Sequence, residues 1–163
     1  MRRNKTLILT AHCILNQNSV LHDWERAKGP FTKIVQTLIS EDISIIQLPC
    51  PEFAYLGPDR APKTKLEYDS PEYRALCKKL AQPIIDQVLT YHKHDYNILG
   101  LVGIENSPTC DSNLQKGIFV EELTNILRLK GIILRSIDIP EQYVEGCNTN
   151  FKKALELFIH QST

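Results

Sequence analysis

The sequence predicts an α/β fold in which a parallel sheet of about four strands carries helices on both faces. Apolar, strand-like runs occupy residues 6–11, 43–48, 97–102 and 132–137. Each run is followed by a segment with the apolar spacing of a helix. Strands that alternate with helices favour parallel pairing through right-handed crossovers. The composition, with 42% hydrophobic and 23% charged residues, is typical of a globular protein.

The helices are predicted from apolar periodicity and from residues that favour helix ends. Residues 30–40, 117–130 and about 150–160 have apolar side chains at helical spacing. Ser70 and Pro71 favour the start of another helix. A serine side chain can accept a hydrogen bond from a free N–H group of the first turn, and proline has no backbone N–H group that would stay unpaired there. A kink or break is expected within this helix at Pro83.

The strands are expected in the order 2-1-3-4, as a compact Rossmann-like or flavodoxin-like sheet. A length of 163 residues fits one domain spanning residues 1–163. The connections at about 13–29 and 50–69 are unusually long for this class. Both leave from carboxyl ends of strands, where open α/β sheets bind ligands.

The charge balance argues for a small-molecule ligand. Lysine plus arginine and aspartate plus glutamate both number 19, so no net field draws the protein to nucleic acid or to a membrane. Only about six apolar residues precede His12, too few for a signal peptide or a membrane span. A cytoplasmic protein is therefore expected.

Three of the five cysteines follow predicted strands within a few residues: Cys13, Cys50 and Cys110. Since carboxyl ends of parallel strands meet at one edge of a sheet, we expect these thiols to converge. Three thiolates can hold a metal or an iron–sulfur cluster with one coordination position left for a substrate. Cys77, on an apolar helix face, is expected to fill the core, and Cys147 is expected near the surface.

Four polar residues accompany these cysteines. Glu52 and Ser107 are candidate catalytic groups, although each is also a residue type that caps helices. His12 and Arg60 are candidate substrate-binding residues. Arg60 could equally be a surface cation, and His12 could face away from the site.

The motifs formed by these residues resemble the thiouracil desulfidase family. The resemblance is carried by Cys13, Cys-Pro-Glu at 50–52, Arg-Ala-Pro at 60–62 and Ser-Pro-Thr-Cys at 107–110. It follows the order and spacing of the family over nearly the whole chain.

This resemblance implies that Cys13, Cys50 and Cys110 hold a [4Fe-4S] cluster with one iron free of protein ligands. It implies catalytic roles for Glu52 and Ser107. The expected enzyme is a desulfidase that removes sulfur hydrolytically from a thiocarbonyl small molecule, such as a thiouracil-like heterocycle.

The chain departs from the family pattern in three places, which indicates a divergent branch. Ile14-Leu15-Asn16 follows the first cysteine, where the family commonly has Leu-x-Gly. Asp111 follows the last cysteine, where the family usually has glycine. Segment 16–28 does not match the corresponding family stretch. Its residues His22, Trp24 and Arg26 could form a lid over a flat heterocycle, or Trp24 could simply anchor the loop.

Two other functions remain open at this stage. Three thiolates could bind zinc in a regulatory or sulfur-carrying module without catalysis. A cysteine hydrolase that uses His12 as the base for Cys13 is less favoured, because adjacent residues of a strand point to opposite faces.

Overall fold

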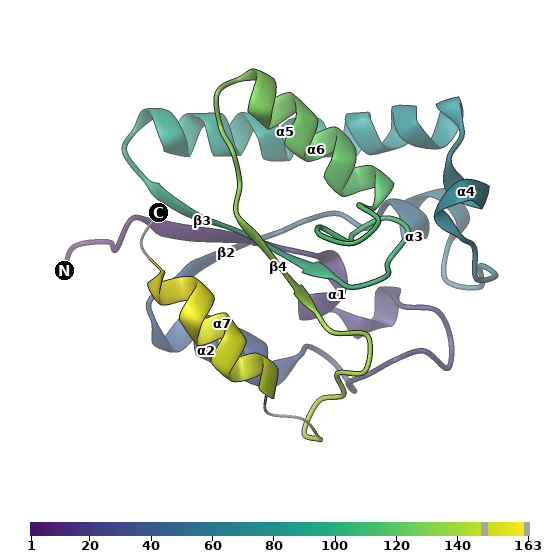
Figure 1. Ribbon diagram of the computed structural model, residues 1–163, viewed down its shortest axis with the longest axis horizontal. Coiled ribbons are helices and arrows are strands. Elements are labelled where there is room, and N and C mark those ends of the chain that lie inside the picture. Colours follow the sequence, from purple (N-terminus) through teal and green to yellow (C-terminus); the bar gives the residue numbers. More distant parts are fainter. Residues whose placement is uncertain (148–149, 162–163) are drawn as a thin grey trace.

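The computed structural model of the protein describes residues 1–147 and 150–161. Four parallel strands form a sheet in the order β2-β1-β3-β4 (Figure 1). The strands are β1 (Thr6–Thr10), β2 (Ser44–Gln47), β3 (Asn97–Ile104) and β4 (Ser136–Ile139). The predicted α/β, Rossmann-like class and its strand order are confirmed.

Helices cover both faces of this sheet (Figure 1). One face carries α5 (Pro71–Lys93) and α6 (Ile118–Leu129), and the other carries α2 (Thr32–Ser40) and α7 (Asn150–His160). Neighbouring residues of the central strands enter opposite cores: Leu9 packs beneath α5 and α6, while Ile8 packs against α2 and α7. Because β1 is buried on both faces, its sequence is a continuous apolar run.

Two predicted elements differ from the structure. β4 begins at Ser136, four residues later than predicted, because the chain before Ser136 has not yet joined the sheet. In that stretch Ile132 packs beneath α5 and α6, while Ile133 is exposed. The break expected at Pro83 is absent, since α5 continues through it. Pro83 is exposed, so the carbonyl that lacks an N–H partner can bind water instead.

The two long connections contain short helices that the sequence did not predict. They are α1 (His12–Leu15), the 3₁₀ helix η1 (Gln17–Ser19), α3 (Pro51–Leu56) and α4 (Lys65–Tyr68). With three to six residues each, they are too short to produce a clear helical period.

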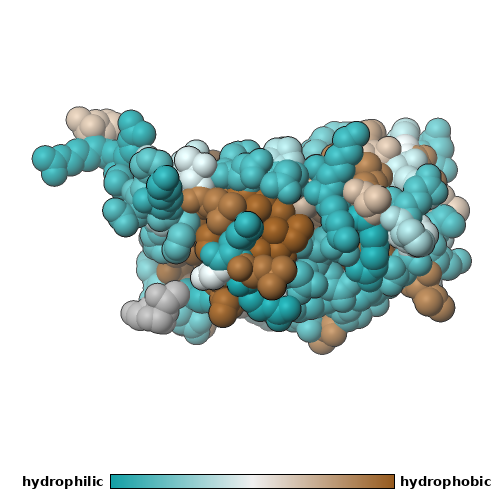
Figure 2. Space-filling model, turned by 90° about the horizontal axis from the view of Figure 1, so that it is seen from above, coloured by the Kyte–Doolittle hydropathy of each residue, from teal (hydrophilic) through white to brown (hydrophobic). Residues whose placement is uncertain are grey.

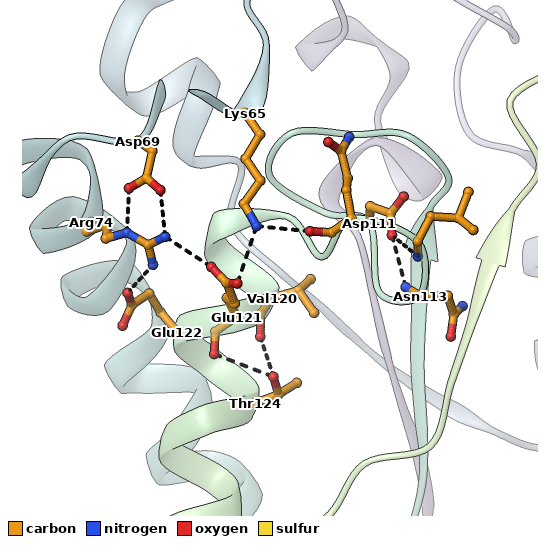
Figure 3. Close-up of polar contacts among 11 residues, drawn as sticks. Lys65, Asp69, Arg74, Asp111, Asn113, Val120, Glu121, Glu122 and Thr124 are labelled. Atoms are coloured by element: carbon orange, nitrogen blue, oxygen red, sulfur yellow. Dashed lines mark hydrogen bonds and ion pairs between the residues drawn. The ribbon is translucent and has the colours of Figure 1, made fainter. Parts of the chain in front are cut away.

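An ion-pair network joins α4, α5 and α6 (Figure 3). The guanidinium of Arg74 contacts Asp69 at 2.6 Å, Glu122 at 2.8 Å and Glu121 at 3.1 Å. Lys65 of α4 reaches Glu121 at 3.3 Å. The network therefore holds the end of the second long connection against α6.

Seen from above, the surface is largely hydrophilic, with a large hydrophobic patch near its middle and smaller hydrophobic areas toward its edges (Figure 2). None of the helices in the described part of the chain is long and apolar enough to cross a membrane.

Candidate active site

A cavity of about 330 Å³ lies at the carboxyl ends of β1, β2 and β3. This is the edge at which open α/β sheets bind ligands. All seven residues singled out from the sequence line it: His12, Cys13, Cys50, Glu52, Arg60, Ser107 and Cys110. The fold therefore brings together segments that are nearly a hundred residues apart in the chain.

Cys13 stands in the short helix α1, directly after β1. The buried side chain of Gln17 fixes this segment, because its amide donates to the carbonyl oxygen of Cys13 at 2.9 Å and accepts from the backbone N–H of Arg26 at 2.8 Å. Burial raises the pKa of the Cys13 thiol to about 12, although the nearby charge of Arg26 opposes the shift.

Cys50 follows β2 and occupies the N-cap position of α3, without a capping hydrogen bond from its side chain, and Pro51 is the first helical residue. Burial raises the pKa of its thiol, and the backbone N–H groups of Phe53 and Glu52 oppose that shift by stabilising the thiolate. The helix end therefore offsets part of the effect of burial on this thiol.

Cys110 lies in the connection after β3, in a turn that Ser107 organises. The hydroxyl oxygen of Ser107 accepts the backbone N–H groups of Thr109 at 3.2 Å and Cys110 at 3.0 Å. Residues 108–110 form a turn rather than a helix, and the Ser107 side chain caps this turn. The hydroxyl hydrogen of Ser107 has no acceptor among the described residues, so it is available to a ligand.

Asp111 explains one departure from the family pattern. This buried carboxylate accepts the backbone N–H of Asn106 at 2.7 Å. It also accepts those of Asn113 at 2.9 Å and Leu114 at 2.8 Å (Figure 3). Glycine has no side chain to make these bonds. The Asp111 carboxylate therefore stabilises the connection that carries Cys110.

Two glycines allow this connection to pack against the sheet and α6. A Cβ atom at Gly117 would overlap the backbone of Thr109 and Cys110, and one at Gly103 would overlap Asp138 and the carbonyl of Cys110. The position of Cys110 thus depends on two close backbone approaches that only glycine permits.

Glu52 is held from two sides. Its Oε1 accepts the hydroxyl of Thr109 at 2.8 Å, and its Oε2 pairs with Arg60 at 3.3 Å. The hydroxyl of Tyr73 lies 2.8 Å from that of Thr109. Because Thr109 gives its hydrogen to Glu52, Tyr73 must be the donor to Thr109. A buried relay, Tyr73 to Thr109 to Glu52, therefore runs from α5 into the cavity.

Arg60 is almost fully enclosed. Its side chain is 3% exposed and that of Glu52 is 13% exposed. The Arg60 guanidinium also donates to the carbonyl oxygens of Ser19 at 2.9 Å and Gly57 at 3.1 Å. Arg60 is thus a partner of Glu52 that joins the two long connections, rather than a surface cation.

His12 lines the cavity, but its ring is held by the protein. Nδ1 donates to the carbonyl oxygen of Leu48 at 3.0 Å, which leaves Nε2 as an acceptor 3.5 Å from the amide of Asn16. Neither nitrogen is bonded to the thiol of Cys13. The arrangement gives no support to a cysteine nucleophile with His12 as its base.

The segment considered as a lid is divided between two places. Trp24 is 59% exposed and borders the cavity, as does Arg26. His22 pairs with Asp23 at 3.0 Å on the surface and does not line this cavity.

The other two cysteines lie where the sequence predicts. Cys77 is buried in the core beneath α5 and α6, and Cys147 is exposed.

The three cavity thiols form a donor set that fits an iron–sulfur cluster, which takes cysteine thiolates. After burial, the charges of Cys50 and Cys13 are the largest causes of the raised pKa of Cys110, and all three cysteines line the same cavity. Within residues 1–147 and 150–161, no three His, Cys, Asp or Glu side chains are close enough to hold a single metal ion. Thiolates around one zinc ion must approach to within about 4 Å, so zinc binding would require these thiols to move together.

Sequence reasoning missed the residues that support this set. Thr109 is the variable position of the Ser-Pro-x-Cys motif, and Tyr73 looked like an ordinary core residue. Gln17 lies in the segment without a family match, as does Arg26, which the sequence suggested only as part of a lid. Only the position of Thr109 inside the motif offered a signal.

Comparisons with known proteins found one relative that aligns along almost the whole chain. It is described as uncharacterized protein MJ0003 of Methanocaldococcus jannaschii, and it is 46% identical over 157 residues, covering 96% of this chain and 99% of its own length. No family model and no solved structure matches the chain.

Proposed function

We propose that this chain, which belongs to the same family as protein MJ0003 of Methanocaldococcus jannaschii, is a desulfidase that removes sulfur from a thiocarbonyl small molecule. One observation carries the proposal: Cys13, Cys50 and Cys110 line one cavity together with Glu52 and Ser107. This is the set of residues that the resemblance to the thiouracil desulfidases assigns to the cluster and to catalysis.

The three thiolates would hold a [4Fe-4S] cluster. Bound there, a cluster with one iron free of protein ligands would supply Lewis-acid polarisation of the carbon–sulfur bond. Overall, C=S and water become C=O and hydrogen sulfide. The exchange is hydrolytic, so electrons balance without an external donor.

Glu52 is the group best placed to take a proton from the attacking water. Thr109 and Arg60 each fix one of its oxygens, and a carboxylate has further lone pairs free to accept. Arg60 also places a positive charge 3.3 Å from this carboxylate. Because both partners are buried or nearly so, Glu52 keeps one orientation toward the cavity.

Ser107 has the complementary capacity. Its oxygen is occupied by two backbone N–H groups, which leaves its hydrogen to donate. It would bind the substrate at an acceptor atom or return a proton to the departing sulfur.

Anaerobic purification tests the proposal. We expect brown protein with about four irons per chain and sulfide release from 2-thiouracil or another thiolated heterocycle. Cys50→Ser should lose both the iron and the activity. Cys147→Ser, which changes an exposed cysteine outside the cavity, should retain both.

Colourless, iron-free protein after anaerobic reconstitution would overturn the proposal. Zinc in place of iron, bound by the same cysteines and without sulfide release, would favour the alternative of a zinc-binding or sulfur-carrying module.

A further inference from the structure

Arg26 is a cavity residue whose orientation the protein fixes. Its Nη1 donates to three backbone carbonyl oxygens, those of Pro140 at 2.6 Å, Glu141 at 2.8 Å and Tyr143 at 3.2 Å. The ring of Phe31 lies 5.4 Å from the guanidinium carbon. One end of the planar guanidinium is therefore anchored, and its plane is set.

The other edge of Arg26 has no protein partner. Among the described residues, nothing accepts from its Nε or Nη2, and no carboxylate pairs with it. Besides Cys13, the charges that act most on Arg26 are those of Glu141 and Glu105. Both acids are engaged elsewhere: Glu105 accepts the backbone N–H of Glu141 at 2.8 Å, and Glu141 accepts a side-chain amide at 2.6 Å. Three N–H donors of this cavity-lining residue are thus without a partner among the described residues.

The second guanidinium of the cavity differs in this respect. Arg60 has Glu52 as its counterion, whereas Arg26 is partly buried with no carboxylate against it. A charge withdrawn from water is unfavourable unless an opposite charge or hydrogen bonds compensate it. The Nε and Nη2 edge of arginine matches a carboxylate in a planar, bidentate pair.

We propose that the free edge of Arg26 binds a carboxylate of the substrate, so that the natural substrate is a thiocarbonyl compound bearing an acidic group. This inference rests on the proposed function for its chemistry. Apolar residues of the cavity, including Leu21, Trp24 and Ile104, would hold the remainder of a flat molecule.

A binding experiment without turnover tests this subsite. Uracil and its 6-carboxylate, orotate, differ by one carboxylate, and nicotinamide and nicotinate differ in the same charge. None of the four carries a thiocarbonyl. Calorimetric titration of the anaerobically purified protein should show that at least one carboxylate binds about tenfold or more tightly than its neutral partner.

Arg26→Gln should reduce that preference to about onefold, and Arg26→Lys, which retains the charge but not the fork, should retain part of it. Arg135→Gln is the matched control, because Arg135 also donates to backbone carbonyls, at Phe158 and Gln161, but lies outside the cavity. It should leave the preference unchanged. Circular dichroism checks that each variant is folded. If Arg26→Gln does not fold, the comparison of Arg26→Lys with the unaltered protein still tests the inference.

Equal affinities within both pairs in the unaltered protein would overturn the inference. An Arg26→Gln protein that loses iron but keeps its carboxylate preference would also overturn the inference. In that case Arg26 would stabilise the cysteine thiolates and would not bind the carboxylate. If the proposed function is wrong, the protein will contain no iron and release no sulfide. The carboxylate preference is measured separately from both and would not change.

Discussion

Replacing Thr109 with valine would test the buried relay that holds Glu52. Valine has nearly the shape of threonine but neither donates nor accepts, so Thr109→Val breaks two 2.8 Å hydrogen bonds at once. The hydroxyl of Tyr73 is then left without an acceptor in a fully buried position. An orphaned buried donor costs about 1–3 kcal/mol, whereas Glu52 can recover a partner from water in the cavity.

We therefore expect Thr109→Val to lower the free energy of unfolding by about 2 kcal/mol, and the melting temperature by about 4–8 °C for a chain of this size. Urea and thermal unfolding of the metal-free protein measure both. Tyr73→Phe removes the hydroxyl donor and leaves no buried donor without an acceptor. It should therefore lower the free energy of unfolding by less than Thr109→Val does. The double variant should then be less destabilised than the sum of the two single variants.

Strict additivity would refute the reasoning, because it would mean that the two hydroxyls do not interact. A Thr109→Val protein as stable as the unaltered one would refute it as well. If the relay positions Glu52, Thr109→Val should also slow sulfide release, and Thr109→Ser should restore most of the rate.

Three further predictions concern the surroundings of the cavity. The hydroxyl of Thr10 is buried without a hydrogen-bond partner in the described structure, so Thr10→Val should raise the unfolding free energy by about 1 kcal/mol; calorimetry showing a loss would contradict this. Burial raises the pKa of Cys13 from 9.0 to about 12. The unfolded chain therefore releases this proton first, and metal-free protein should lose stability as the pH rises from about 9 to 12. The urea midpoint of Cys13→Ser should fall less steeply over that range, and an equal slope would rule out this source. Gly117→Ala should lower the free energy of unfolding by about 2 kcal/mol or more and lower the iron content, because the new methyl group overlaps the backbone of Thr109 and Cys110. Unchanged urea unfolding and iron content would show that the loop can move aside.

The sequence predicts features that depend on neighbouring residues better than features that depend on residues far apart in the chain. Strand 1 could be recognised because its apolar run is buried on both faces, and the helix at Ser70 because capping is local. The start of β4 was misplaced because Ile133 is apolar yet exposed. The short helices of the long connections have no period to detect, although they orient Cys13 and Cys50.

The sequence by itself determined the α/β class, the strand order and the cysteines that share one edge of the sheet. Alternation of strands and helices restricts the topology so strongly that these features follow from local patterns. Only the tertiary structure decided the partners of each group. The free edge of Arg26 depends on carbonyl groups more than a hundred residues away, and the orientation of Glu52 depends on Thr109 and Tyr73. Such contacts arise from how loops pack on the finished sheet, and no spacing along the chain encodes them.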